Sequence, residues 1–232
     1  MSDTTLPEPT PHPPAPAGPM ARRFGVVVPV KPAALAKSRL RGLGEDARRQ
    51  LAAAFAVDTV LAAVECPLVG RVLVVTDDVR LALSLRDLGI DAVPDGESGS
   101  LNASLRQGAA EVVRRDPSLR PVALCADLPA LRPGELGDAL RATAPSSPSF
   151  VADLEAVGTT LYAAQGLASF DPQFGDGSRQ AHLAQGAQEV EISGIESVRR
   201  DVDTPQDLRS AVELGVGPRT SWVVTTLRLL TD

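Results

Sequence analysis

The chain has 232 residues, 44% of them hydrophobic, and a formal net charge of −6. This length and apolar content suit one α/β domain with a sizeable core. The negative charge argues against nucleic acid and anionic membranes as partners, and no apolar run is long enough to cross a membrane. Cys66 and Cys125 form no metal-ligand pattern, which suits free thiols in a reducing cytosol, so we expect a cytoplasmic protein.

The N-terminal 22 residues are expected to form a disordered tail. Proline recurs between Pro7 and Pro19 with few apolar side chains, and the apolar segment of a signal peptide is missing. We therefore expect three parts: a disordered Pro-rich tail at residues 1–22, one folded domain at 23–218 and a C-terminal extension at 219–232.

Short apolar runs alternate with helix-length segments as far as residue 142. Sequence patterning predicts strands at residues 24–30, 72–75, 90–93 and 122–125. It predicts helices at residues 46–63, 79–88, 101–115 and 133–142. This alternation is typical of right-handed βαβ units, which build a mostly parallel, Rossmann-like sheet.

The pattern changes in the second half of the chain. Strand-like runs at residues 150–152 and 160–163 have no helix between them, which predicts an antiparallel pair inserted into the sheet. A later edge strand is expected at residues 189–192. A last helix is expected to start at Pro205, with Thr204 as its cap.

The loop after the first strand carries three cations. Ligands of open α/β sheets bind at the carboxyl ends of the strands, so this loop is a candidate site. It lacks the glycine patterns of a Rossmann dinucleotide site and of a P-loop, and instead contains Lys31, Lys37 and Arg39. These cations suit a triphosphate and its pyrophosphate leaving group. A solvated basic loop is the alternative.

Acidic residues follow the fourth strand and precede the last helix. Asp127 emerges from a buried apolar run, where a carboxylate needs a partner. Asp201 and Asp203 are two residues apart, so in an extended segment they point the same way. Together the three carboxylates predict a Mg²⁺ site. The alternatives are a turn or capping role for Asp127 and support of the last helix by Asp203.

Two glycine-containing stretches are candidate anion sites. Gly158 precedes Thr159, and the segment from Gly175 to Ser178 also combines glycine with a hydroxyl. Glycine lets backbone N–H groups approach an oxyanion, and a hydroxyl adds a donor. A hairpin turn and a surface loop are the alternatives. His182 follows Ser178 by four residues, and both a structural and a phosphate-binding role stay open for it.

These motifs resemble those of the guanylyltransferases of deazaflavin coenzyme (coenzyme F-420) biosynthesis. Five motifs occur in the family's order, over about residues 24–217: Pro29-Val-Lys31 with Lys37-Ser-Arg39-Leu40, Asp127-Leu-Pro129, Gly158-Thr159, Phe174-Gly175 with Ser178 and His182, and Asp201-Val-Asp203-Thr-Pro205. The chain departs from the family pattern at Ala126, where glycine is usual, and at Asp176-Gly177, where Pro-Asp is usual.

The resemblance implies a GT-A-like nucleotidyltransferase fold, a GTP donor and Mg²⁺ held by Asp127, Asp201 and Asp203. It also implies that Thr159, Gly175 and Ser178 bind a small phosphorylated carboxylic acid. The actinobacterial members act on phosphoenolpyruvate, which predicts enolpyruvoyl-2-diphospho-5′-guanosine and pyrophosphate as products. The guanylylated product would pass to a downstream transferase.

The sequence leaves other functions open. The acceptor could instead be 2-phospho-L-lactate, 3-phosphoglycerate or a molybdopterin. A domain that only senses nucleotides would need fewer carboxylates than Asp127, Asp201 and Asp203, the acidic trio, provide. A Rossmann oxidoreductase is disfavoured because the glycine fingerprint is missing.

Overall fold

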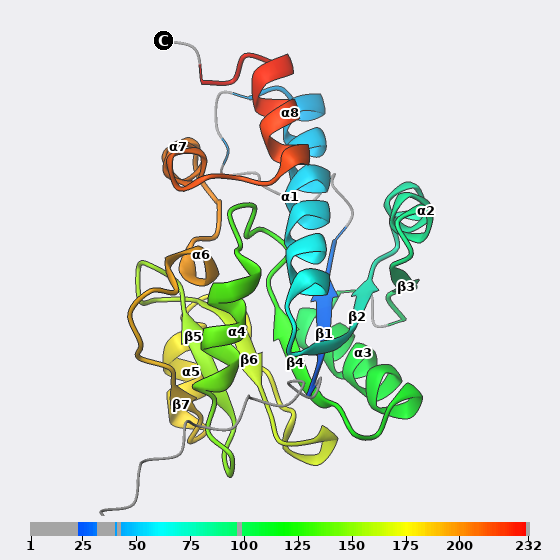
Figure 1. The fold of residues 1–232 in the computed structure, drawn as a ribbon, viewed down its shortest axis with the longest axis vertical. Coiled ribbons are helices and arrows are strands. Elements are labelled where there is room, and N and C mark those ends of the chain that lie inside the picture. The colour runs from blue at the N-terminus through cyan, green and yellow to red at the C-terminus, as the bar shows by residue number, and fades with distance from the viewer. Residues whose placement is uncertain (1–22, 32–39, 41–42, 97–98, 231–232) are drawn as a thin grey trace, which may run out of the picture.

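The computed structural model describes residues 23–31, 40, 43–96 and 99–230. Seven strands form one sheet in the order β3-β2-β1-β4-β6-β5-β7 (Figure 1). The strands are β1 (Phe24–Pro29), β2 (Val69–Val75), β3 (Asp91–Val93), β4 (Arg120–Leu124), β5 (Ser149–Ala152), β6 (Thr159–Ala163) and β7 (Gln188–Glu189). The predicted tail at residues 1–22 lies outside the described residues.

The sheet is mixed but mostly parallel, as the sequence predicts. Strands β1, β2, β3 and β4 are parallel to one another, and β6 is antiparallel to both of its neighbours, β4 and β5. The β5–β6 pair is the expected antiparallel pair, and among the described strands β6 alone runs against the others. The edge strand β7 is parallel to β5 and covers only two residues, fewer than the run at 189–192 suggests.

Helices cover both faces of the sheet. They are α1 (Glu45–Glu65), α2 (Val79–Asp87), α3 (Leu101–Arg115), α4 (Pro133–Arg141), the 3₁₀ helix η2 (Leu167–Ser169), α5 (Ser178–Ala184), α6 (Glu196–Arg199), α7 (Pro205–Leu214) and α8 (Pro218–Thr226). None of these described helices is long and apolar enough to span a bilayer.

Alternate residues of β1 belong to two different cores. Val26 and Val28 pack in the cluster that includes α1, α2 and α4, whereas Val27 packs with α3 on the opposite face. Helix α3 lies close to the sheet because Gly108 has no side chain; a Cβ there would overlap Val27 and Val75. The two cores explain why β1 is apolar along its whole length.

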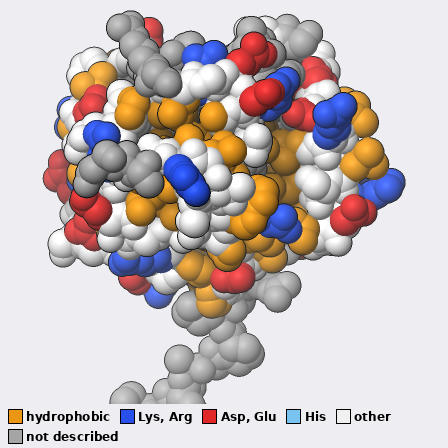
Figure 2. Space-filling model, turned by 90° about the horizontal axis from the view of Figure 1, so that it is seen from above, with side chains coloured by type: hydrophobic (Ala, Val, Ile, Leu, Met, Phe, Trp, Pro, Cys, Tyr) orange, Lys and Arg blue, Asp and Glu red, His pale blue; other side chains and the backbone are white. Residues whose placement is uncertain are grey.

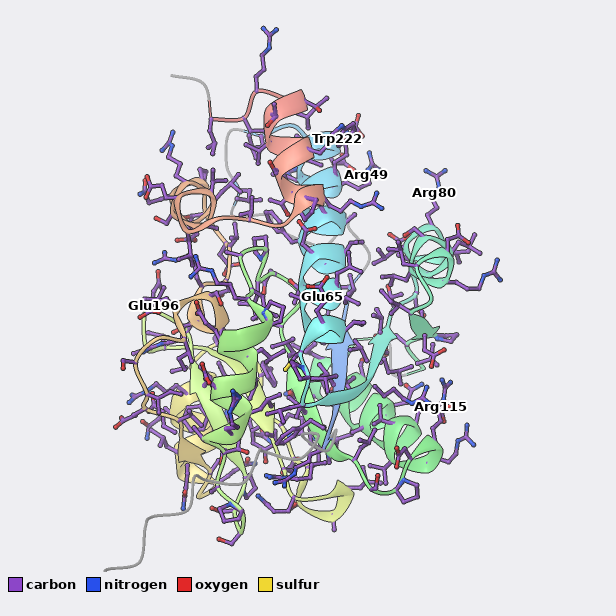
Figure 3. All side chains as sticks on the ribbon, viewed as in Figure 1. Arg49, Glu65, Arg80, Arg115, Glu196 and Trp222 are labelled. Carbon is purple, nitrogen blue, oxygen red and sulfur yellow. The ribbon has the colours of Figure 1, made fainter. Side chains whose placement is uncertain are left out.

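The helix expected to be the last, α7, is followed by one more, α8, which is fastened to α1. Asp58 of α1 is 5% exposed, and its carboxylate accepts hydrogen bonds from the backbone N–H groups of Arg219 (3.1 Å) and Thr220 (2.7 Å) at the start of α8. Figure 1 shows α8 alongside the N-terminal half of α1, and Figure 3 shows Trp222 and Arg49 together at this end. A negative charge at a helix N-terminus is stabilising. Asp58 therefore holds the start of α8, which is also where the C-terminal extension is expected to begin.

Candidate functional site

The loop that carries Asp127 is held by helix α1. The hydroxyl of Thr59, which is fully buried, donates to the carbonyl of Ala126 (3.2 Å) and accepts from the backbone N–H of Leu128 (3.1 Å). Helix α4 begins only at Pro133, so Asp127 does not cap it. The backbone on both sides of Asp127 is thus fixed at the carboxyl end of β4.

The segment that carries Asp201 and Asp203 is anchored by the residue between them. Val202 is fully buried, and its backbone N–H donates to the carbonyl of Asp127 (3.1 Å). Because successive side chains of an extended segment alternate, Asp201 and Asp203 point away from this core. The cap of α7 is a capping box formed by Thr204 and Asp207, so it does not depend on the Asp203 side chain.

These two segments bring the acidic trio together. Asp127, Asp201 and Asp203 each offer one carboxylate oxygen, and these oxygens lie within 4.8 Å of one another. Ligand oxygens around one Mg²⁺ lie at most about 4.2 Å apart, twice the usual metal–oxygen distance. A small closure of the carboxylates therefore suffices, and an all-oxygen donor set is what Mg²⁺ and Mn²⁺ prefer.

A polar cleft of about 350 Å³ opens beside the trio. Asp201 and Asp203 lie along it, so the cleft and the trio form one site. The glycine- and hydroxyl-containing segments predicted as anion sites also line it, with Gly158, Thr159, Gly175 and Ser178. The fold thus unites three motifs that are far apart in the sequence.

The turn that carries Gly175 has a conformation that favours glycine. Gly175 and Gly177 have φ angles of 137° and 70°, which side-chain-bearing residues rarely adopt. Asn102 of α3 fixes this turn from outside: its amide donates to the carbonyl of Phe174 (3.0 Å), and its oxygen accepts from the Phe174 N–H (2.8 Å). Asn102 was not predicted as a site residue; its only signal was a polar amide in the first turn of a predicted helix.

The polar cleft is strongly acidic. Among the described residues that line it, Arg200 is the single cation, and the acidic ones are Asp153, Glu155, Asp176, Asp201, Asp203 and Asp207. Arg179, the cation next to Ser178, is instead paired with Glu189 (2.8 Å). An anionic ligand would be repelled here unless a metal cation bound with it.

A second, more apolar cleft of about 290 Å³ adjoins the first. Lys31 and Asp127 line it together with Phe55, and it shares Cys125 and Phe174 with the polar cleft. The end view in Figure 2 shows hydrophobic side chains toward the middle of the molecule, with charges of both signs around them. Lys37 and Arg39, the other predicted cations, lie outside the described residues.

Residues 24–229 match the family described as guanylyl transferase CofC like. The chain belongs to this family. The resemblance expected from the sequence is thereby confirmed, and the family covers nearly all of the chain that the structure describes.

Two relatives of this CofC-like chain, each about half identical to it, carry the same name. A phosphoenolpyruvate guanylyltransferase of Thermomonospora curvata is 52% identical over 198 residues, which is 85% of this chain and 87% of the relative. A protein of the same name from Streptosporangium roseum is 49% identical over 203 residues, 88% of this chain and 91% of the relative.

Solved structures support the fold alone. A putative nucleotide-diphospho-sugar transferase from Desulfovibrio desulfuricans is similar with a TM-score of 0.65 at 15% identity, covering 89% of this chain and 96% of that one. A Mycobacterium tuberculosis protein in complex with manganese has a TM-score of 0.52 at 20% identity, covering 83% and 99%. Both agree with the predicted α/β nucleotidyltransferase-like architecture.

His182 of the CofC-like chain lies beneath the polar cleft. It is fully buried and stacks on Phe150 and Tyr162, with ring centroids 5.3 and 4.8 Å away. Its Nε2 accepts from the backbone N–H of Gln173 (2.9 Å), and its Nδ1 lies 3.0 Å from the Thr159 hydroxyl oxygen. Burial lowers the pKa of His182 from 6.5 to about 4, so the ring is neutral near pH 7.

This buried histidine should make stability depend on pH. Between pH 6.5 and 4 the unfolded chain binds a proton at His182 that the folded chain does not. The part of the free energy of unfolding that depends on neutral His182 is therefore fully present above pH 6.5 and is lost as the pH falls toward 4. The loss amounts to about 3 kcal/mol in total. Urea unfolding midpoints measured across this window should fall, and should fall less steeply in His182→Gln. Equal slopes in both proteins would contradict the assignment.

Proposed function

We propose that this chain transfers GMP from GTP to phosphoenolpyruvate, giving enolpyruvoyl-2-diphospho-5′-guanosine and pyrophosphate for coenzyme F-420 biosynthesis. The observation that carries the proposal is the acidic trio beside a polar cleft that Thr159, Gly175 and Ser178 also line, in a chain of the CofC-like family. The relatives named phosphoenolpyruvate guanylyltransferase, about half identical over most of their length, support the choice of acceptor.

The chemistry needs no general base. A phosphate oxygen of the acceptor forms a bond to the α-phosphorus of GTP, and the bond from that phosphorus to the bridging oxygen of pyrophosphate breaks. The attacking oxygen is already ionised at neutral pH, so no proton is moved. Catalysis then rests on positioning and charge neutralisation, which fits a site whose buried histidine is neutral and tied to the fold.

Asp127, Asp201 and Asp203 would hold Mg²⁺, which supplies positive charge for the phosphate groups of both substrates. Lys31 lines the apolar cleft that Asp127 also lines, where its ammonium group can neutralise the leaving pyrophosphate. Lys37 and Arg39 belong to the same proposal on sequence grounds. The apolar cleft is the place for the guanine of GTP, because the two faces of a planar base are weakly polar.

Neutral donors would hold the acceptor's carboxylate. Thr159, Gly175 and Ser178 line the polar cleft, where backbone N–H groups and hydroxyls can bind an anion through several modest hydrogen bonds. The product carries an activated diphosphate, so the enzyme that consumes it would be a transferase with GMP as its leaving group.

A crossed assay tests the proposal. Pyrophosphate release should be measured with GTP, ATP, CTP and UTP, each against phosphoenolpyruvate, 2-phospho-L-lactate, 3-phosphoglycerate and no acceptor. GTP with phosphoenolpyruvate should exceed every other pair by roughly tenfold or more, a discrimination of about 1.4 kcal/mol. A faster reaction with another acid would replace the acceptor, and binding of GTP without turnover on any acid would favour the sensing alternative.

A further inference from the structure

The direction of the buried hydrogen bond between His182 and Thr159 is set by the second hydrogen bond of the His182 ring. A backbone N–H can only donate, so the Nε2 that receives the Gln173 N–H bond carries no proton. A neutral imidazole has one N–H group, which must then be on Nδ1. The 3.0 Å contact is therefore Nδ1–H donating to the Thr159 hydroxyl oxygen.

The Thr159 hydroxyl is left with its own proton to donate. Among the described residues its oxygen has no hydrogen-bond partner besides His182. Thr159 is 6% exposed and lines the polar cleft, so the proton can reach a ligand there. A threonine hydroxyl can otherwise act as donor or acceptor; here its acceptor role is already taken.

We infer that His182 is a positioning residue that makes the Thr159 hydroxyl a committed donor to the acceptor's anionic group. This inference rests on the proposed function, in which Thr159 faces the acceptor. His182 does not touch the substrate itself. Its stacking on Phe150 and Tyr162 prevents rotation of the ring, and the Gln173 bond selects the tautomer that leaves Nδ1 protonated.

The same ring also holds the turn of the cleft. Gln173 precedes Phe174 and Gly175, so loss of the Gln173 bond could disturb the cleft without involving Thr159. The test must therefore separate the two nitrogens. Asparagine places its amide near Nδ1 of a histidine, and glutamine places its amide near Nε2, which provides a matched pair of variants.

The experiment is steady-state kinetics of GTP and phosphoenolpyruvate in the wild type, His182→Asn, His182→Gln, Thr159→Val and Thr159→Val/His182→Gln. His182→Gln and Thr159→Val should each raise KM for phosphoenolpyruvate about tenfold, as expected for one hydrogen bond to an anion. KM for GTP should change less than about twofold in both. The double variant should be no worse than Thr159→Val, because the two residues act through one hydroxyl.

His182→Asn, which keeps the bond to Thr159, should recover most of the affinity for phosphoenolpyruvate. Equal losses in His182→Asn and His182→Gln, or multiplicative losses in the double variant, would overturn the inference and make His182 a general support of the fold. Melting temperatures of all five proteins identify a variant that fails to fold. Absence of turnover in the wild type would instead reject the proposed function.

Discussion

Asp127→Asn and Asp203→Asn should each lower turnover by roughly a thousand-fold, the scale on which loss of charge stabilisation slows phosphoryl transfer. Each substitution removes one of three carboxylates whose oxygens lie within 4.8 Å. The backbone of both segments is held by other groups, Thr59 and Val202, so the fold should survive. The measurement is kcat with saturating GTP and phosphoenolpyruvate, with melting temperature as the check on folding.

The double variant should be little slower than either single one. Residues that hold one ion act as a unit, so once the first substitution has removed the ion's contribution to kcat, the second has no further effect. Glu155→Gln is the matched control, because Glu155 is an exposed carboxylate on the same cleft but outside the trio. It should change kcat less than about threefold, as is usual for exposed surface charges. Multiplicative losses, or turnover that persists in excess chelator, would contradict a shared metal.

The fold was accessible from the sequence because its signals are local. The strand at β1 is apolar on both faces, and its β-branched residues mark a fully buried strand. Gly89 has a positive φ, as expected where a helix ends, and Thr204 with Pro205 marks the start of another. Such patterns depend only on neighbours along the chain, so the strands and the helices α1 to α4 and α7 could be predicted closely. The helices α5, α6 and α8 were not predicted, and α7 is not the last helix.

The meeting of the acidic trio was also predictable, for a topological reason. Asp127 follows a buried strand, and ligands of open sheets gather at the carboxyl ends of strands. The side chains that hold the loops at this edge of the sheet could not be predicted. Thr59 reaches Leu128 across 69 residues, and Asn102 reaches Phe174 across 72. Nothing in a single sequence pairs such positions, because each is an ordinary polar residue on a helix.

The packing of α8 against α1 and the role of His182 were not predicted either, because both depend on partners that the sequence alone does not pair. Asp58 lies within an apolar helix, and its partner N–H groups are 161 and 162 residues away. His182 was left between two roles, since a histidine next to a glycine-rich turn suits both. Only its burial and the donor at Gln173 fix its charge and tautomer.

Lys31→Met should lower kcat by roughly a hundred-fold while KM for phosphoenolpyruvate stays within about twofold, because the lost interaction is with the leaving group. Lys31 is exposed at the carboxyl end of β1 and lines the apolar cleft with Asp127. Negative charge grows on pyrophosphate as the bond to the α-phosphorus breaks, so a cation placed there stabilises the transition state more than the bound substrates. A hundred-fold loss corresponds to about 2.7 kcal/mol.

The matched control is Arg23→Met. Arg23 is also exposed and directly precedes β1, so its substitution removes the same charge at the opposite end of the same strand. It should leave kcat nearly unchanged. Lys31→Arg, which keeps the charge, should recover much of the lost rate. An equal loss in Arg23→Met would show that the overall field of the protein matters and not the position of the ammonium group. A higher KM for GTP with unchanged kcat would mean that Lys31 binds the triphosphate equally in the ground and transition states, and the leaving-group role would be wrong.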